Sequence, residues 1–445
     1  MEDGDDLAST PGRETALACV RAGIDAARPD RVVADAVATD DGRTRLRIGD
    51  AAYDLSRTDR IVVLGGGKAA DGVTTALEGL LGERIDAGAV VTPAGGDGDA
   101  ADGHRVERYR GAHPVPDRAG VTGADRVRDL AAAADAHTLV LAVVTGGGSA
   151  LLPAPAGGLS LADLRTTTDA LLDAGAAIDD LNAVRKHCST LKGGRLASVA
   201  APATVVGLLF SDVIDDDPGV IASGPTAPDD TSYADALAVL DRYDVDPPAA
   251  VRDRLERGAA GGLAETPGSD DPVFDRVTNH VLANAFTAVD AARTTARDRG
   301  YDVCPLSTSV RGEAREAALT AVAVAEEVVA TGNPVERPAV VLSAGETTAT
   351  VRGDGIGGPN AEFALAAAVE LPDGATLACV DTDGRDGSSE FAGALVDGDT
   401  VADVPAARRA LDTSDAFGYL GDRNAVISTG ATGTNVNDLR VLVVE

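Results

Sequence analysis

The chain has 445 residues, more than one hydrophobic core usually supports, so its length predicts two domains. Its 71 acidic and 39 basic residues give a formal net charge of −32, which argues against nucleic acid or an anionic membrane as a partner. The surplus of aspartate and the scarcity of lysine resemble haloarchaeal cytoplasmic proteins, whose carboxylates keep the surface hydrated at molar salt.

Neither the cysteines nor the hydropathy of the chain indicates a secreted, metal-binding or membrane protein. The four cysteines are far apart and form no CxxC or Cys/His cluster, so no zinc site or disulfide framework is expected. The acidic start of the chain is unlike a signal peptide, and the longest apolar runs are too short to span a bilayer. We therefore expect a soluble cytoplasmic protein. Its oligomeric state is left open by the sequence, and a homodimer is the assembly we consider.

A strand, a glycine turn and a helix are predicted around residue 66. The apolar run 61–64 stops at three glycines, Lys68 follows, and an alanine-rich helical pattern begins straight afterwards. Glycines let the backbone approach a ligand closely, and the first amides of a helix attract anions. Gly66 and Gly67 are therefore predicted to contact a phosphate or carboxylate.

Lysine is so rare in this chain that each one is informative. Of the 39 basic residues only Lys68, Lys186 and Lys192 are lysines, and the rest are arginines. Lysine acts as a compact point charge on phosphate, whereas arginine acts as a planar fork. We predict that all three lysines are functional; chance retention is the alternative.

Strand-like apolar runs alternate with alanine-rich helical stretches, which predicts an α/β fold with mainly parallel sheet. Polar, glycine-rich stretches suggest a domain over residues 12–257, a linker with a helical connection over 258–337, and a second domain over 338–445. The predicted strands are residues 61–64, 89–92, 139–144, 204–210, 339–342, 376–380 and 441–444.

Polar turns follow several of these strands, at the sheet edge where ligands of open α/β sheets bind. A second glycine turn at 146–148, followed by Ser149, has room for an anion or a ribose, although a purely structural turn is the alternative. Asp212 follows the run 204–210 and is placed to bind Mg²⁺ or to take a proton. A further polar turn contains Ser223, Gly224 and Thr226.

A basic cluster lies between these strands. Residues 182–197 contain Arg185, Lys186, Lys192 and Arg195 and no acidic residue. In a chain this acidic, such a cluster favours an anionic ligand; the alternative is a helix face whose cations pair with nearby carboxylates. His187 is expected to be a structural histidine.

Two general nucleotide-binding motifs give different results. The Walker A pattern is not met, because alanine follows the lysine and valine stands at the first glycine position, which excludes a P-loop NTPase. The Rossmann pattern fits Gly65, Gly67 and Ala70, with Glu83 or Asp86 near the position of a ribose-binding acid. On spacing alone, an NAD enzyme is therefore an alternative.

A series of motifs, taken in order, resembles the glycerate kinases of the type 2 family, whose C-terminal part is called the MOFRL domain. The resemblance runs over nearly the whole chain. The motifs are GGGKAA (65–70), HPVPD (113–117), TGGGSALL (145–152), NAVRKHCSTLKGGRLA (182–197), SDVIDDDPGVIASGPT (211–226), SAGETTATVRG (343–353) and TGTNVNDL (432–439).

The resemblance implies two α/β domains with Rossmann-like, mainly parallel sheets, helices on both faces and an active site in the interdomain cleft. It implies ATP-dependent phosphorylation of D-glycerate at the 2-hydroxyl with Mg²⁺, giving 2-phosphoglycerate and ADP. The alternatives are an NAD(P)H-dependent hydroxypyruvate reductase and a non-catalytic sensor of sugar acids. The basic groups favour a kinase, because phosphoryl transfer depends on positioning and on stabilising negative charge.

Site residues are assigned from the motifs and the resemblance. The predicted catalytic residues are Lys68, Asp212 and Arg385, and the predicted metal ligands are Asp212 and Asp383. The residues predicted to bind substrate or phosphate are Gly66, Gly67, Ser149, Arg185, Lys186 and Lys192. The residues predicted to bind the nucleotide are Gly146, Gly147, Gly148, Ser223, Gly224, Thr226 and Glu346.

The chain departs from the family pattern at one arginine. Where the family reads GGRNQE, Pro359 stands at the position of the arginine, whereas Arg385 occupies a position of the TDGRDG turn that is usually uncharged. We predict that Arg385 supplies the missing charge. The alternative is that it pairs with Asp383 and Asp386 across a surface turn, where an ion pair contributes little.

Overall fold

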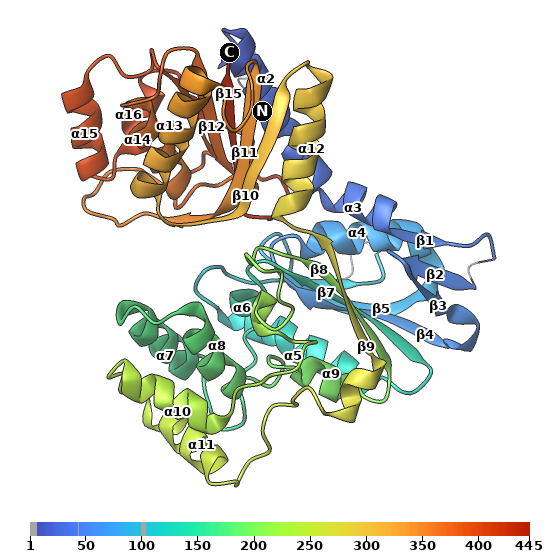
Figure 1. Ribbon diagram of the computed structural model, residues 1–445. Helices are drawn as coiled ribbons and strands as arrows, with labels where there is room; N and C mark the ends of the chain where they lie inside the picture. The colour runs from blue at the N-terminus through green and yellow to red at the C-terminus, as the bar shows by residue number, and fades with distance from the viewer. Residues whose placement is uncertain (1–6, 43, 99–103) are drawn as a thin grey trace. The chain divides into compact units, whose positions relative to one another are not determined.

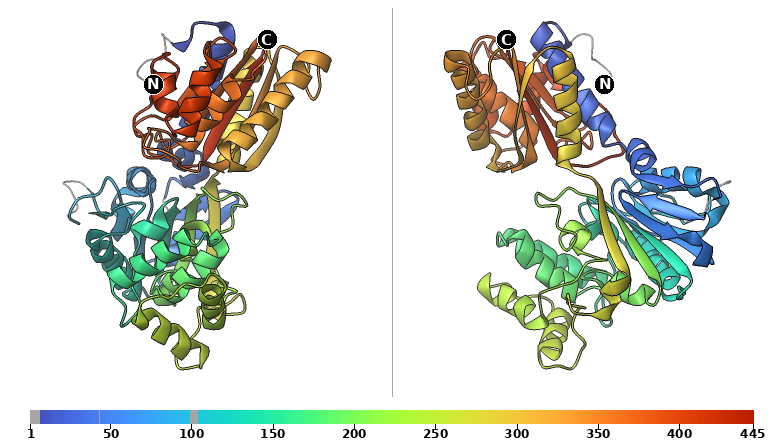
Figure 2. Two further views of the ribbon diagram at one scale, coloured as in Figure 1. Left: turned by 90° about the vertical axis from the view of Figure 1, so that its left-hand side faces the viewer. Right: turned by 45° about the vertical axis from the view of Figure 1, so that its right-hand side comes forward.

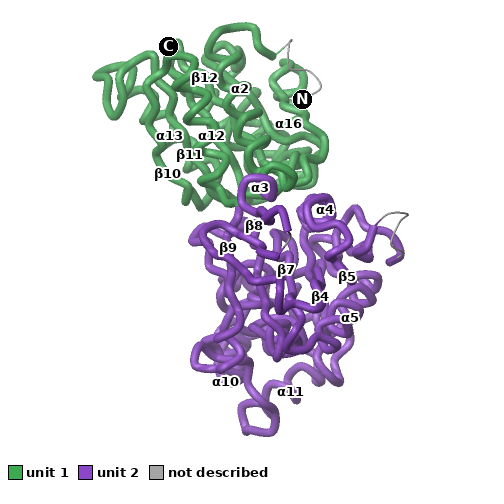
Figure 3. Tube along the Cα trace, turned by 90° about the vertical axis from the view of Figure 1, so that its right-hand side faces the viewer, with its two compact units in different colours: residues 1–31, 283–445 green, residues 32–282 purple. Residues whose placement is uncertain are grey.

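The structure, a computed structural model, describes residues 7–42, 44–98 and 104–445 and contains two compact units (Figures 1 and 3). Unit 1 comprises the described residues up to Arg31 together with residues 283–445, and unit 2 comprises the described part of residues 32–282. Each unit contains a six-stranded sheet with helices on both faces, which confirms the predicted α/β class. None of the described helices is long and apolar enough to cross a membrane.

The sheet of unit 2 has the strand order β6-β5-β4-β7-β8-β9, and every pair from β6 to β8 is parallel. Helices α4 and α5 cover opposite faces of it (Figure 1). Val62 and Leu64 share a core cluster with Val127 and Ala131 of α5, so the alternation of the strand turns Ile61 toward the face covered by α4. An antiparallel ribbon, β1-β2-β3, also belongs to this unit.

The strands of unit 2 are β1 (Val37–Thr39), β2 (Arg45–Ile48), β3 (Ala51–Asp54), β4 (Arg60–Gly66), β5 (Ile85–Thr92), β6 (Glu107–Arg110), β7 (Thr138–Thr145), β8 (Thr204–Phe210) and β9 (Val277–Ala283). Its helices are α4 (Ala70–Leu81), α5 (Arg118–Ala132), α6 (Gly148–Leu151), α7 (Leu161–Asp173), α8 (Ile178–His187), α9 (Arg195–Ala200), α10 (Tyr233–Arg242) and α11 (Ala249–Ala259). Helix α3 (Pro29–Ala36) contains the boundary between the units.

The sheet of unit 1 is mixed, with the order β10-β11-β15-β12-β13-β14. Only β10 and β11 pair in parallel, and β15 is antiparallel to both of its neighbours. The predicted parallel arrangement therefore holds for unit 2 but not for this sheet. Parallel neighbours need a crossover connection, whereas β13 follows β12 after the loop 382–392 and returns antiparallel beside it.

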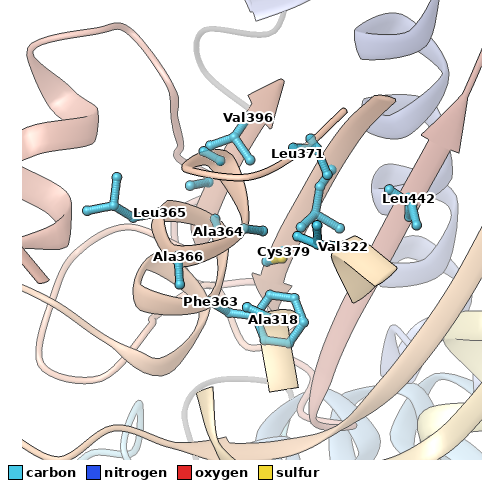
Figure 4. Packing of buried hydrophobic residues seen from close by; sticks show 14 of the residues in the cluster. Ala318, Val322, Phe363, Ala364, Leu365, Ala366, Leu371, Cys379, Val396 and Leu442 are labelled. Atoms are coloured by element: carbon cyan, nitrogen blue, oxygen red, sulfur yellow. The ribbon is translucent and has the colours of Figure 1, made fainter. Parts of the chain in front are cut away.

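Helices α13 and α14 pack on one face of this sheet and α2 and α12 on the other (Figures 1 and 2). Ala318 and Val322 of α13 meet Phe363 of α14, Cys379 of β12 and Leu442 of β15 in one buried cluster (Figure 4). Cys379 is thus a small apolar core residue. The elements of unit 1 are α2 (Pro11–Ala26), α12 (Ala285–Asp298), β10 (Asp302–Glu313), α13 (Ala314–Thr331), β11 (Ala339–Thr348), α14 (Pro359–Ala368), β12 (Ala375–Asp381), β13 (Gly393–Asp397), α15 (Val404–Asp412), α16 (Ala416–Gly421), β14 (Val426–Ile427) and β15 (Asp438–Val444).

The division into units differs from the predicted domain boundaries. Helix α2 was assigned to the N-terminal domain, but it packs on α12, β12 and β15 and belongs to unit 1. The stretch 258–337 is not a linker, because α12, β10 and α13 lie inside unit 1 and β9 forms an edge of the other sheet. These contacts join segments far apart in the chain, and local composition carries no sign of them.

Every strand predicted from the sequence occurs, as β4, β5, β7, β8, β11, β12 and β15. Five strands of the two large sheets are not predicted from the sequence. Strands β6, β9, β10 and β14 each form a sheet edge, and β13 lies next to one. Edge strands are partly exposed and carry polar residues, as in the sequence ERYR of β6, so they lack the continuous apolar run that marks a central strand.

Candidate active site

The two glycine turns of unit 2 lie at the same sheet edge. Strands β4, β7 and β8 are parallel neighbours, so Lys68, the turn at 146–148 and Asp212 all follow their carboxyl ends. The amide of Lys68 donates to the carbonyl oxygen of Gly146 at 2.8 Å. A Cβ at Gly147 would lie 3.0 Å from Cδ2 of His113 and 3.1 Å from Cγ of Lys68. Lys68 and His113 therefore meet over the second turn.

Backbone amides of the first turn are already engaged. The amide of Gly67 donates to the carbonyl oxygen of Val91 at 3.0 Å, and that of Ala69 to the hydroxyl of Thr145 at 3.2 Å. A Cβ at Gly67 would lie 2.0 Å from the Thr145 hydroxyl oxygen, and one at Gly66 2.7 Å from the Val91 carbonyl oxygen. The amide of Gly67 is thus not open to an anion, and the close packing of neighbouring strands is what requires glycine here.

A cavity of about 60 Å³ lies beside the second turn, inside unit 2. Its polar lining includes Ser149, Arg185, Ser189 and Lys192, and most of its remaining wall consists of proline, leucine and valine side chains. Among the residues that the structure describes, no acidic one lines it. Its described lining therefore combines apolar walls with two cations and no carboxylate.

Neither cation of this cavity is neutralised by a described residue. The guanidinium of Arg185 makes no hydrogen bond or ion pair with the part of the chain that the structure describes, and burial lowers the pKa of Arg185 to about 10. Lys192 Nζ donates to the carbonyl oxygen of Leu152 at 3.1 Å and to no other group in the described part of the chain. Burial, and then the nearby Arg185, lower the pKa of Lys192 to about 7. Buried cations are costly when unpaired, so this arrangement favours an anionic ligand.

Lys186 and His187 lie outside the cavity lining. Lys186 Nζ forms a buried ion pair with Asp229, with 3.2 Å between Nζ and Oδ1. Burial raises the pKa of Asp229, but the charge of Lys186 and the hydrogen bonds of Thr231 outweigh it, so the pKa is lowered overall. His187 Nδ1 contacts the carbonyl oxygen of Ala183 at 2.7 Å, as expected for a structural histidine. Lys186 thus pairs with a nearby carboxylate, which was the alternative for the basic cluster. Lys192 lines the cavity, where an anionic ligand would meet it.

A chain of hydrogen bonds joins the two polar turns. The hydroxyl oxygens of Ser149 and Ser223 are 2.7 Å apart, and Ser223 donates to Oδ1 of Asn182 at 2.8 Å. Ala222 and Ser223 have φ of 51° and 62°, in the left-handed region that non-glycine residues rarely adopt. The strained turn thereby brings the Ser223 hydroxyl against Ser149.

Two other residues of this stretch have structural partners. The carbonyl oxygen of Gly224 accepts from the amide of Gly194 at 2.7 Å. The hydroxyl of Thr226 donates to Oδ1 of Asn279 on β9 at 2.7 Å, and the Asn279 amide returns a bond to the Thr226 carbonyl oxygen. Thr226 therefore ties its turn to the edge strand of the sheet.

The remaining predicted site residues lie in unit 1. Glu346 is exposed near the end of β11. In the turn after β12, Oδ1 of Asp383 accepts from the amide of Arg385 at 2.8 Å. The side chain of Arg385 is exposed and forms no ion pair with a described residue, so the alternative of a pairing with Asp383 and Asp386 does not hold. These residues and the cavity thus belong to different units.

The turn of Arg385 touches the start of α14. The buried carboxylate of Asp386 accepts from the amides of Asn360 and Ala361 at 3.0 and 2.8 Å. Burial raises the pKa of Asp386 to about 7, although these two amides lower it. Pro359 is the first residue of this helix, α14. The position where the family has an arginine is therefore adjacent to the turn that contains Arg385.

A buried polar network beneath these turns was missed by the sequence analysis. Asn360 Nδ2 donates to Asp438 at 2.6 Å, and the same carboxylate accepts from Arg440 at 2.6 Å. Arg440 also donates to the hydroxyl of Thr347 at 2.8 Å. The only sequence signal was the motif TGTNVNDL, whose polar residues precede an apolar strand; which partners they meet could not be read from it.

The two predicted metal ligands, Asp212 and Asp383, do not belong to a cluster of three or more metal-binding side chains among the described residues. Within residues 7–42, 44–98 and 104–445, no three His, Cys, Asp or Glu side chains gather as a metal site. Asp212 lies in unit 2 and Asp383 in unit 1. Single carboxylates suit Mg²⁺ carried by nucleotide phosphates, since this ion binds one or two carboxylates together with phosphate oxygens and water.

Two family models match the chain. The model described as "Domain of unknown function (DUF4147)" matches residues 15–256, and the model described as "MOFRL family" matches residues 339–438. The first match extends across α2, which the structure places in unit 1.

Curated relatives and a solved structure match nearly the whole chain. A D-glycerate 2-kinase of Thermotoga maritima is 36% identical over 433 residues, which cover 96% of this chain and 97% of the relative. A crystal structure of a glycerate kinase from the same organism has a TM-score of 0.83 and 35% identity, covering 97% of this chain and 99% of that one. A protein of Agrobacterium vitis with a provisional hydroxypyruvate reductase name is 38% identical over 398 residues, covering 86% of this chain and 87% of that protein.

Proposed function

Because the chain belongs to the type 2 glycerate kinase family, we propose that it transfers the γ-phosphoryl group of ATP to the 2-hydroxyl of D-glycerate, giving 2-phosphoglycerate and ADP. The observation that carries the proposal is the cavity in which Arg185 and Lys192 lie without a neutralising carboxylate. A substrate with one carboxylate supplies the missing negative charge. The cytoplasmic location, the homodimer and the placement of the site between two domains stay predictions.

In this proposal Arg185 and Lys192 hold the carboxylate of D-glycerate. Lys68, at the same sheet edge, stabilises negative charge on the transferring phosphoryl group, and Asp212 orients the 2-hydroxyl. The hydroxyl oxygen forms a bond to phosphorus as the bond to ADP breaks, and the hydroxyl proton passes to the carboxylate of Asp212. Lys186 and Thr226 have structural partners, so we assign them supporting roles.

The nucleotide is proposed to bind along the second glycine turn and the turn after it. This group comprises Gly146, Gly147, Gly148, Ser223 and Gly224, all in unit 2. Mg²⁺ would be held by Asp212 together with the phosphates, and when bound it would neutralise part of the phosphate charge. The assignments of Glu346 to the nucleotide and of Asp383 to the metal, both in unit 1, stay predictions.

The reductase alternative is less well supported by the fold. Asp86, a candidate ribose-binding acid, stands at the start of β5, where Oδ2 accepts from the amide of Ile61 at 2.8 Å. That is the amino end of the strands, opposite to the glycine turn. Glu83 precedes β5 and so lies on the same side. Neither acid is placed to meet a dinucleotide at the carboxyl ends.

The first expected result is kinase turnover. ATP, Mg²⁺ and D-glycerate in one cuvette should release ADP in a coupled assay, whereas NADH with hydroxypyruvate in another should show no oxidation. Both are run at molar KCl, because we propose that a protein of charge −32 with so little lysine needs high salt. NADH oxidation without ADP release would favour the reductase, and binding of glycerate and ATP without turnover would favour a sensor.

Binding of D-glycerate should weaken as pH rises through neutrality. The pKa of Lys192 is lowered to about 7, so the cavity has two positive charges below that pH and one above it. If the carboxylate needs both charges, KM for D-glycerate should rise roughly tenfold from about pH 6 to about pH 8. The measurement is KM across this range at constant KCl.

Lys192→Arg is the control for this pH dependence, because arginine stays protonated throughout. Its KM should vary little with pH. A KM of the parent enzyme that does not vary with pH would show that binding does not need the charge of Lys192. An equally steep rise of KM in Lys192→Arg would assign the pH dependence to another group.

A further inference from the structure

The cavity holds two serines whose hydrogen bonds are arranged in opposite senses. From this we propose that it distinguishes a dihydroxy acid from its deoxy analogue: Ser189 donates to the carboxylate beside Arg185 and Lys192, and Ser149 accepts a hydrogen bond from the 3-hydroxyl. The proposal rests on the proposed function for the identity of the acid. The sense of each serine rests only on contacts inside unit 2.

Ser149 can offer the cavity only an acceptor. Asn182 Oδ1 has no hydrogen, so Ser223 must donate to it across their 2.8 Å contact. Ser223 has then used its single proton, so in the 2.7 Å contact between the two hydroxyls Ser149 must be the donor. The proton of Ser149 is therefore committed, and its remaining capacity is a lone pair.

Ser189, in contrast, can offer the cavity only a hydrogen-bond donor. Its hydroxyl oxygen accepts from the amides of Leu191 and Lys192, both at 3.2 Å, and a hydroxyl oxygen has two lone pairs. What it has left is the O–H donor. Ser189 thus adds a donor to a lining that also contains the cations Arg185 and Lys192, whereas Ser149 adds an acceptor.

The acceptor selects a hydroxyl at C3. In the proposed reaction the 2-hydroxyl must reach the phosphoryl group, which leaves the 3-hydroxyl of D-glycerate as the donor for Ser149. A ligand without that hydroxyl leaves the acceptor of Ser149 unpaired in a largely apolar cavity. Such a mismatch costs roughly tenfold to a hundredfold in affinity.

The test is calorimetric binding at molar KCl without nucleotide, using D-glycerate, D-lactate and D-3-fluorolactate. D-Lactate lacks the 3-hydroxyl, and fluorine at C3 can accept but cannot donate. The parent should bind D-glycerate roughly tenfold to a hundredfold more tightly than either analogue. Ser149→Ala should reduce the ratio between D-glycerate and D-lactate to within about threefold, because the acceptor is gone.

Thr167→Val is the matched control variant. Thr167 lines the same cavity, but its hydroxyl donates to the carbonyl oxygen of Asp163 at 2.8 Å within α7. It should therefore keep the ratio of the parent. Ser223→Gly is a second variant: it removes the acceptor of the Ser149 proton, and glycine suits a φ of 62°. It should raise the affinity for D-3-fluorolactate relative to D-lactate, because Ser149 can now donate.

Two outcomes would overturn the proposal. One is a parent that binds D-3-fluorolactate as tightly as D-glycerate, since Ser149 would then act as a donor. The other is a Ser149→Ala variant that keeps the glycerate-to-lactate ratio. Failure of the kinase function is separate: it would appear as no ADP release in the turnover assay, whatever the binding ratios show.

Discussion

Replacing Lys68 by alanine should lower the turnover of D-glycerate by roughly a hundredfold or more without unfolding the protein. A positive charge that meets the transferring phosphoryl group acts most strongly in the transition state, so the loss is expected in kcat. The measurement is kcat in the coupled ADP assay at molar KCl, together with the melting temperature.

The fold should tolerate this change because main-chain contacts position the turn. The amide of Lys68 donates to Gly146, and α4 begins only at Ala70. Lys68→Arg is the matched variant, since it keeps the charge but changes its shape, and it should retain part of the rate. Turnover of Lys68→Ala close to that of the parent would reduce Lys68 to a structural turn residue.

Arg385→Ala should lose most of the turnover while leaving the melting temperature nearly unchanged, and Pro359→Arg on that background should restore part of it. The expected loss is roughly tenfold to a hundredfold, the range for removing one charge that stabilises a transition state. The melting temperature should hold because the Arg385 side chain is exposed and has no ion pair with the described residues.

The rescue is expected because the two positions belong to turns that touch. Asp386, next to Arg385, caps the helix that Pro359 opens by accepting from the amides of Asn360 and Ala361. Arginine is tolerated at the first position of a helix, so Pro359→Arg should fold. Arg385→Ala as active as the parent would show that the enzyme works without this charge, and Pro359→Arg that restores nothing would show that the two positions are not equivalent.

Local patterns in the sequence were enough for the α/β class, the central strands and the alignment of Lys68, the second glycine turn and Asp212 at one sheet edge. Central strands of a parallel sheet are buried on both faces, so each appears as an apolar run followed by turn residues. Once these runs are taken as parallel neighbours, their carboxyl ends must meet, and the residues that follow them must gather.

The tertiary structure alone decided which cations of the basic cluster lack a neutralising carboxylate among the described residues. Lys186 and Lys192 are close in the chain and indistinguishable by pattern, yet Asp229 neutralises one and the other lies in a cavity with Arg185. The same holds for the senses of Ser149 and Ser189, for the antiparallel position of β15 and for the docking of α2 on unit 1. Each depends on contacts between residues far apart in the chain, whereas periodicity and turn chemistry describe only what neighbours along the chain can do.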